Sequence, residues 1–435
     1  MKKLLPLFVS AALGTLSSAV WAENLAEIYN QAKENDPQLL SVAAQRDAAF
    51  EAVTSSRSAL LPQINLTAGY NINRSDQDPR ESDLLSAGIN FSQELYQRSS
   101  WINLDTAEKK ARQADSQYAA AQQGLILRVA KAYFEVLRAQ DNLEFVRAEK
   151  AAVGRQLEQT KQRFEVGLSA ITDVHDAQAQ FDGVLADEVL AKNSLTNSYE
   201  ALREITGQEY SKLAVLDTKR FAASRTTESS EALIEKAQQQ NLSLLAARIN
   251  QDVARDSISL ASSGHLPSLT LDGGYNYGNN NAKNTSSEEY NDFKIGVNLK
   301  VPLYTGGNTT SLTKQAEFAY VAASQDLEAA YRSVVKDVRA YNNNINASIG
   351  ALRAYEQAVI SAKSALEATE AGFDVGTRTI VDVLDSTRRL FDANKNLSNA
   401  RYDYILSVLQ LRQAIGTLSE QDVMDINAGL KAAKK

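Results

Sequence analysis

Apolar and polar residues alternate strictly in four short segments of the chain. From Ile64 to Ile72 every second residue is apolar, and the residues between are polar or small. The segments 87–92, 269–278 and 293–301 alternate in the same way. A period of two predicts β-strands with one apolar and one polar face. Polar segments, 74–83 and 279–289, separate the strands in pairs, so we expect a β-hairpin in residues 64–95 and another in residues 269–301.

The rest of the chain has the pattern of long helices. Residues 97–164 contain no proline, and as one helix they would extend for about 100 Å. Apolar residues recur in heptads from Val129 to Phe164, with a second apolar stripe beside them. A helix that is apolar on two sides needs two neighbours, as in the wall of a hollow cylinder. The return helix 171–206 and the lead-in helix 37–60, placed end to end, would nearly match its length.

The chain repeats this plan. FEVGLSAITDVHDAQAQF at 164–181 returns as FDVGTRTIVDVLDSTRRL at 373–390, and LLPQINLTAGYN at 60–71 returns as HLPSLTLDGGYN at 265–276. Such self-similarity predicts two structural repeats built alike. The expected units are a signal peptide (1–22), a first repeat (23–207), an equatorial segment (208–240), a second repeat (241–416, with a long helix at 305–373 and a return helix at 379–416) and a C-terminal equatorial segment (417–435).

The composition and the first residues limit the compartments and the partners that we expect for the protein. Lys2 and Lys3, an apolar run and a small residue at position 22 form a secretory signal. The net charge of −7 argues against nucleic acid as a partner. The chain has no cysteine, so disulfides and lipid attachment through cysteine are excluded.

Membrane contact would have to come from the strands or a surface helix, because no segment after the signal has about 18 consecutive apolar residues. Strands of about ten residues, tilted by about 45°, cover roughly 23 Å, close to the apolar band of an outer-membrane barrel. Four strands cannot close a barrel, so several copies would have to share one. A hydrated interior calls for three copies or more. The alternative is a sheet whose apolar face covers a soluble core.

Catalytic chemistry has little support in the sequence. The two histidines, His175 and His265, lie far apart, and no nucleophile or metal-binding motif accompanies them. We expect no enzyme activity, no cofactor and no metal site, and we interpret His175 as a solvated turn residue. A periplasmic coiled-coil scaffold or adaptor without channel activity remains the alternative function, and an outer-membrane enzyme is a weaker one.

The chain resembles the TolC family of outer-membrane efflux channels. The resemblance rests on ENLAEIYNQAKENDPQL after the signal, QRFEVGLSAITDV, PLYTGG, NNINASI and VGTRTIVDVLD, and it extends over the whole mature chain. It implies a mixed α and β membrane protein: a homotrimer whose protomers each give four strands to a 12-stranded outer-membrane β-barrel. That barrel would continue into a long periplasmic α-helical barrel with a small equatorial belt. The function implied is passive conduction of drugs, small toxic compounds and exported proteins through the outer membrane of a Gram-negative bacterium.

The resemblance also implies a gate at the periplasmic tip. Asp382 and Asp385 match the acidic rings of the constriction, and Arg378 matches its arginine, with Thr172 and Asp173 as partners. Each Asp could equally be a helix-start residue stabilised by the helix dipole, and Arg378 could be an exposed helix-start arginine. Arg388 and Arg389, which depart from the family pattern, could pair with Asp385.

Phe373 replaces the tyrosine of the family's closed gate and lacks its hydroxyl. The turn residues match the tips on which a periplasmic adaptor (membrane fusion) protein docks: Val166, Gly167, Leu168, Val375, Gly376 and Thr377. Further implied partners are an inner-membrane efflux pump or ABC exporter and the lipid of the outer membrane.

Overall fold

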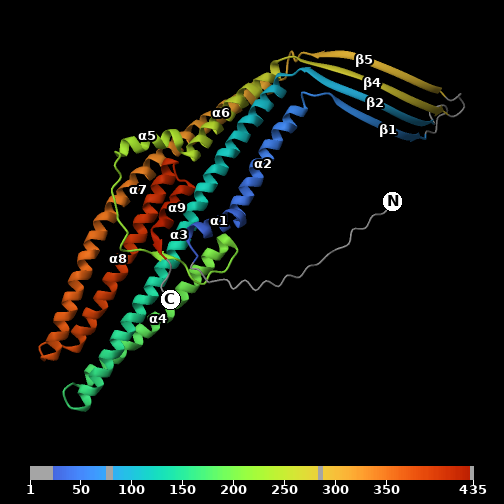
Figure 1. Cartoon of the computed structure of the whole chain (residues 1–435). Helices are drawn as coiled ribbons and strands as arrows, with labels where there is room; N and C mark the ends of the chain where they lie inside the picture. Colours follow the sequence, from blue (N-terminus) through green and yellow to red (C-terminus); the bar gives the residue numbers. More distant parts are fainter. Residues whose placement is uncertain (1–22, 75–81, 283–287, 432–435) are drawn as a thin grey trace.

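The structure is a computed structural model of one chain, and it describes residues 23–74, 82–282 and 288–431. The signal peptide expected at 1–22 lies outside the described residues. The molecule is elongated, with a sheet at one end, long helices running away from it, and two helical hairpin tips at the far end (Figure 1). None of the described helices is both long and apolar enough to cross a membrane.

The sheet joins the hairpins of the two repeats. β1 (Gln63–Asn73), β2 (Ser82–Tyr96), β4 (Ser268–Ala282) and β5 (Glu288–Lys300) lie in the order β1-β2-β4-β5, and every pair is antiparallel. The register places Leu66 opposite Ile89, Ile89 opposite Tyr275, and Tyr275 opposite Phe293. These four side chains are between 52% and 77% exposed in one chain. Alternation in sequence has thus become a continuous apolar face that one chain leaves uncovered.

The second hairpin is longer than the sequence pattern suggested. Residues 279–289 were expected to form a polar connection, but β4 continues to Ala282 and β5 begins at Glu288. The reason is pairing: Asn279, Asn280 and Asn281 lie opposite Leu85, Leu84 and Asp83 of β2. Backbone hydrogen bonding to a neighbouring strand outweighs the low strand preference of asparagine.

The shorter helices pack along two long ones, α3 (Arg98–Glu165) and α7 (Asn308–Asp374). α2 (Pro37–Ser58) and α4 (Ile171–Thr206) pack along α3, and α6 (Leu242–Ser262) and α8 (Ile380–Ile415) pack along α7. A short 3-10 turn, η1 (Ser263–His265), follows α6. α3 also packs against α6 and α8 of the second repeat, which explains why it is apolar on more than one side.

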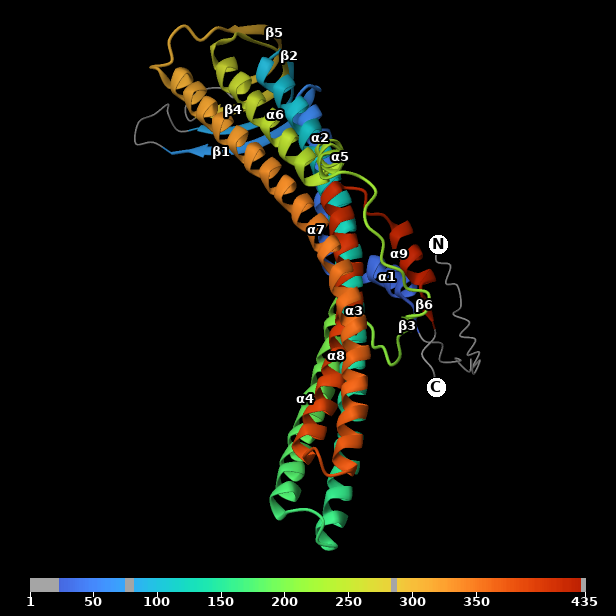
Figure 2. The same cartoon turned by 90° about the vertical axis from the view of Figure 1, so that its left-hand side faces the viewer.

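A belt of short elements lies beside the middle of the long helices (Figure 2). Its members are α1 (Leu25–Asn35), β3 (Val215–Leu216), α5 (Ser230–Gln240), α9 (Glu420–Ala428) and β6 (Leu430–Lys431). β3 and β6 pair with each other, so the two equatorial segments meet. The main hydrophobic core lies where the belt meets α3 and α8, and it includes the fully buried Tyr133 and Phe134.

A second, smaller core lies nearer the tips and holds α3, α4 and α8 together. Its members are all apolar: Val153, Leu157, Ala177, Val184, Ile380, Val383 and Leu384. The two cores pack α4 and the α7–α8 pair against α3, and thereby position the residues at the tips.

Candidate functional site

Each tip is a tight turn between two helices, at the end of the molecule farthest from the sheet (Figure 1). In the first tip (residues 166–170) Gly167 has φ 79°, which favours glycine. Its N–H donates to the Phe164 carbonyl over 2.9 Å, and the Leu168 N–H donates to the Arg163 carbonyl over 2.7 Å. This pair of bonds is the Schellman motif, which satisfies carbonyls at the end of a helix.

The second tip (residues 375–379) repeats that geometry. Gly376 has φ 79°, its N–H donates to the Phe373 carbonyl over 3.1 Å, and the Thr377 N–H donates to the Gly372 carbonyl over 2.8 Å. The glycines predicted at the turns therefore have a backbone role, whatever else they do.

Apolar side chains stand out into solvent at both tips. Val166 and Leu168 are 70% and 71% exposed in the first tip, and Val375 is 76% exposed in the second. An exposed cluster of this kind is typical of a surface that another protein covers.

Asp173 and Asp382 hold the starts of α4 and α8. Asp382 accepts hydrogen bonds from the N–H and the hydroxyl of Thr379, both at 2.9 Å. Asp173 accepts from the N–H of Ala170 over 3.1 Å and from the hydroxyl of Ser169 over 2.7 Å. The helix-start role considered for these residues is therefore present in the structure.

These contacts also fix the charge of Asp382. The hydrogen bonds from Thr379, with a smaller contribution from the positive charge of Arg378, lower the pKa of the Asp382 carboxyl below its usual value. Asp382 therefore stays ionised at neutral pH and supplies a fixed negative charge beside the tip.

Asp385 is paired with both arginines that follow it. Its carboxylate lies 2.9 Å from Arg388 and 2.7 Å from Arg389. The pairing considered from sequence spacing is thus present. All three side chains are at least one-third exposed, so each pair contributes about 0–1 kcal/mol to stability. The larger effect is electrostatic, because two cations reduce the negative potential around Asp385.

Arg378 is exposed and lies on its own helical hairpin. Among the described residues of one chain, no ion pair or hydrogen bond joins its side chain to Thr172 or Asp173. Thr172 is exposed, and the Asp173 carboxylate is occupied by its own helix start. A link from Arg378 to these residues in an assembled channel stays a prediction.

Phe373 is half-buried beside the lower core and contacts an arginine that the sequence reasoning missed. The guanidinium carbon of Arg163 lies 4.5 Å from the centre of the Phe373 ring, and Arg163 Nη1 lies 3.8 Å from Asp374 Oδ1. The only sequence signal for Arg163 was that the repeat alignment places it over a glycine, Gly372.

Metal chemistry gains no support from the tip. His175 is exposed at the start of α4. Within the described ranges, no group of three or more His, Asp or Glu side chains could hold a metal ion.

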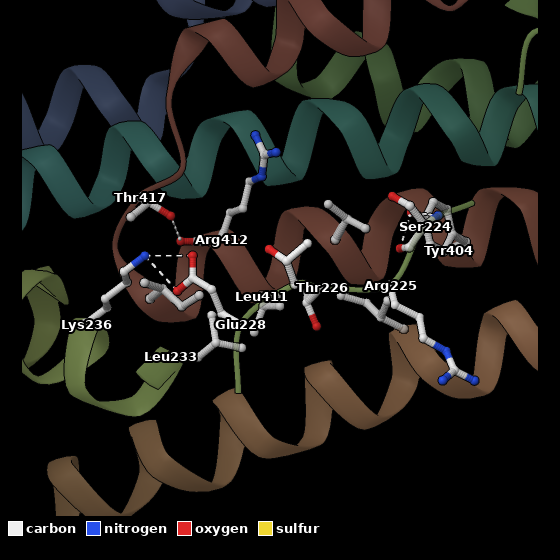
Figure 3. Close-up of a pocket in the computed structure, with 14 residues that line it drawn as sticks. Ser224, Arg225, Thr226, Glu228, Leu233, Lys236, Tyr404, Leu411, Arg412 and Thr417 are labelled. Atoms are coloured by element: carbon white, nitrogen blue, oxygen red, sulfur yellow. Dashed lines mark hydrogen bonds and ion pairs between the residues drawn. The ribbon is translucent and has the colours of Figure 1, made fainter. Parts of the chain in front are cut away.

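A separate cavity of about 310 Å³ lies between the equatorial segment and α8 (Figure 3). Tyr404 and Ser224 exchange two hydrogen bonds at one end, at 2.9 and 3.0 Å, and Lys236 pairs with Glu228 at the other, at 2.7 Å. The Ser224–Tyr404 bonds fasten the equatorial segment to α8 beside the cavity, whereas the Lys236–Glu228 pair lies within the segment itself.

Comparison with known proteins identifies relatives over the full length. The family model for outer membrane efflux proteins matches residues 28–208 and 233–417. The chain is 97% identical to the outer membrane protein TolC of Vibrio cholerae over 100% of both chains. It is 29% identical to the alkaline protease secretion protein AprF of Pseudomonas aeruginosa, over 97% of this chain and 90% of that protein. The solved structure of CusC superposes with a TM-score of 0.80 at 16% identity, over 91% of this chain and 92% of that chain.

Proposed function

The chain belongs to the outer membrane efflux protein family, and from that premise we propose how its periplasmic tip is gated. It is an outer-membrane efflux channel and not an enzyme. The predicted fold class, location and channel function are thereby confirmed. Channels of this family form trimers and work in efflux or secretion systems.

The open four-stranded sheet is the observation that supports a barrel shared by several protomers. β1 and β5 are the outer strands of the four-stranded sheet, and no described segment of the chain pairs with their outer edges. Unpaired strand edges are not stable in lipid, so β5 of one protomer would pair with β1 of the next until the barrel closes. The two repeats, 23–207 and 241–416, would each give one hairpin, and the segments 208–240 and 417–435 would form the belt. The two-part match of the family model supports this division.

The tips form the periplasmic end of the conduit in this proposal, and Arg378 is the residue that holds them inward. A guanidinium can donate planar hydrogen bonds to a hydroxyl and a carboxylate together, so Arg378 would bind Thr172 and Asp173 across neighbouring helices of the trimer. Such exposed links contribute about 0.2–1 kcal/mol each, and a docked partner could break a set of them.

Asp382 and Asp385 form the acidic rings of the constriction. Six carboxylates in a trimer would attract cations and disfavour anions. Arg388 and Arg389 offset the charge of Asp385, so we expect a weaker cation preference than an unpaired ring would give.

Ion selectivity of the purified trimer in a planar bilayer tests this assignment. Under a KCl gradient, Asp385→Asn should move the reversal potential toward anion permeation, because it removes a carboxylate and releases two arginines. The matched control is Asp176→Asn, the counterpart in the first repeat, which should leave the potential unchanged. An unchanged potential for Asp385→Asn would contradict the ring.

Docking of a periplasmic adaptor at the tips, with an inner-membrane pump or ABC exporter behind it, completes the proposal. The exposed Val166, Leu168 and Val375 support a protein contact there. The name of AprF, a protease secretion protein, supports proteins as substrates beside drugs and small toxic compounds. Because the chain has no cysteine, Leu168→Cys would carry its one thiol and should cross-link to the adaptor in cells, whereas Leu66→Cys on the sheet should not.

A further inference from the structure

Each tip has one arginine near its turn, but on opposite sides of it. The repeats align Arg163 with Gly372 and Ser169 with Arg378. In the first repeat the arginine therefore precedes the turn, at the end of α3, and in the second it follows the turn, just before α8. The proposed gate uses Arg378 and leaves Arg163 without a function.

The Arg163 side chain extends from α3 to the end of α7 in the second repeat. Its guanidinium lies over the ring of Phe373 at 4.5 Å and beside the carboxylate of Asp374 at 3.8 Å. Its side chain is 26% exposed, although it lies in the last turn of a helix at the end of the molecule. Guanidinium groups bind aromatic faces through the ring quadrupole, and this contact needs no hydroxyl on the ring. Phe373, which has none, can therefore still connect the two repeats.

A side chain at position 372 of the second repeat would overlap the side chain of Arg378. A Cβ at Gly372 would lie 2.7 Å from Cγ of Arg378 and 3.3 Å from Oγ1 of Thr377. The Arg378 side chain thus passes over the last turn of α7, and the backbone N–H of Arg378 donates to the Gly372 carbonyl over 3.2 Å. The two arginines are placed differently: Arg163 contacts the other repeat of its own chain, and Arg378 stays on its own hairpin.

Among the described residues, Arg163 makes the polar contact between α3 and the second repeat that lies nearest the tip. Farther from the tip, Asp141 accepts hydrogen bonds from Ser398 and Tyr402. Between Asp141 and the tip, the buried Gln156 donates to the buried Thr387 over 3.1 Å. At the tip Asp374 is 68% exposed. A protein that binds the tip could reach the Arg163 contact and leave the contacts of Asp141 and Gln156 intact.

We propose that Arg163, with Phe373 and Asp374, is a clamp within each protomer that holds the α7–α8 tip against α3 in the closed channel and releases on opening. This inference rests on the proposed gate and adds a second element to it. Arg378 would connect the movable tip to neighbouring helices of the trimer, and Arg163 would fasten the same tip to its own chain. Both sets of contacts must then break for the tip to move outward.

Single-channel recording of the purified trimer in planar bilayers tests the clamp. Arg163→Gln should raise the open fraction, because the neutral amide loses the contact with the ring and with Asp374. One guanidinium–ring contact corresponds to about a two- to fivefold change in the ratio of closed to open tips per protomer. Phe373→Leu should act in the same direction. The double variant should not exceed Arg163→Gln, since that substitution alone already removes the contact with the ring. Arg155→Gln, an exposed arginine two turns earlier on α3, is the control and should match the wild type.

The outcomes separate the clamp from the gate. If Arg163→Gln behaves as the wild type while Arg378→Ser opens the channel, the clamp is wrong and the gate stands. If neither variant changes the open fraction, both are wrong. Additive effects of Arg163→Gln and Phe373→Leu would show that the two residues act apart, which contradicts the clamp. Should Arg163→Gln fail to assemble, Arg163→Lys and Asp374→Asn take its place, and Arg163→Lys should lie between wild type and Phe373→Leu because a lysine keeps a cation near the ring.

Discussion

Gly207 and Gly416 end α4 and α8 at matching positions of the two repeats, with nearly the same backbone but very different surroundings. Their φ angles are 72° and 91°, so both lie in the left-handed region. No atom lies within 4 Å of a Cβ built on Gly207. On Gly416 the same atom would lie 2.2 Å from the carbonyl oxygen and 2.6 Å from the carbonyl carbon of Gln240. The repeat therefore offers a matched pair for separating backbone strain from steric overlap.

Alanine at either position carries the cost of the left-handed conformation, about 1–2 kcal/mol. Gly416→Ala must also move the backbone where α5 meets α6, which adds about 1–3 kcal/mol for overpacking. It also disturbs the hydrogen bond of 2.9 Å from Gln123 Nε2 to the Gly416 carbonyl. We expect Gly416→Ala to lower the free energy of unfolding by about 2–5 kcal/mol and Gly207→Ala by about 1–2 kcal/mol.

Thermal unfolding of the purified trimers measures this difference. Because unfolding of a membrane trimer is commonly irreversible, both variants must be heated at the same scan rate as the wild type. Gly416→Ala should unfold at a clearly lower temperature than Gly207→Ala. Equal shifts for the two variants would refute the steric argument, and would mean that the junction of α5 and α6 yields at little cost.

Two further predictions concern charged residues of α3, Arg128 and Glu149. Arg128 donates two hydrogen bonds, at 3.0 and 2.6 Å, to the buried Asp36. Arg128→Leu would leave this carboxylate buried without its cation and should destabilise the trimer by about 3–5 kcal/mol in thermal unfolding, and a loss below about 1 kcal/mol would contradict this role of Arg128. Burial, with the nearby Asp392 and Asp187, raises the pKa of Glu149 to about 6, although Arg388 and Lys395 oppose the shift. Because the pKa is raised in the folded state, the contribution of Glu149 to stability is fully present below the unfolded value of 4.5 and is lost as the pH rises through about 6. Glu149→Gln should therefore raise the midpoint temperature of thermal unfolding at pH 7 and make that temperature fall less between pH 4.5 and pH 6. An unchanged dependence of the midpoint on pH would refute this.

Local patterns in the sequence predicted the elements because each element obeys a short-range rule. The period of two from Ile64 to Ile72 lies within β1, and the proline-free segment 97–164 corresponds to α3, displaced by one residue at each end. The strand residues 279–282 were missed because their pairing with β2 is a contact between distant segments, which polarity alone does not reveal.

The tip was predicted in part for the same reason. Asp173, Asp382 and the two turn glycines carry helix-end signals that sequence spacing contains. The contact of Arg163 with Phe373 joins residues of different repeats, and neither its side-chain direction nor its partner follows from spacing along one helix. The unequal alignment of Arg163 with Gly372 pointed to the position but not to the contact.

Single-channel conductance of Arg378→Ser in planar bilayers tests the central claim most directly. The first repeat has a serine, Ser169, at the position that matches Arg378. The variant therefore replaces the guanidinium side chain with one that the matching turn of the first repeat already accommodates. If Arg378 holds the periplasmic tip closed, the Arg378→Ser trimer should conduct more than the wild type under the same salt and voltage. A conductance equal to that of the wild type would contradict the gate.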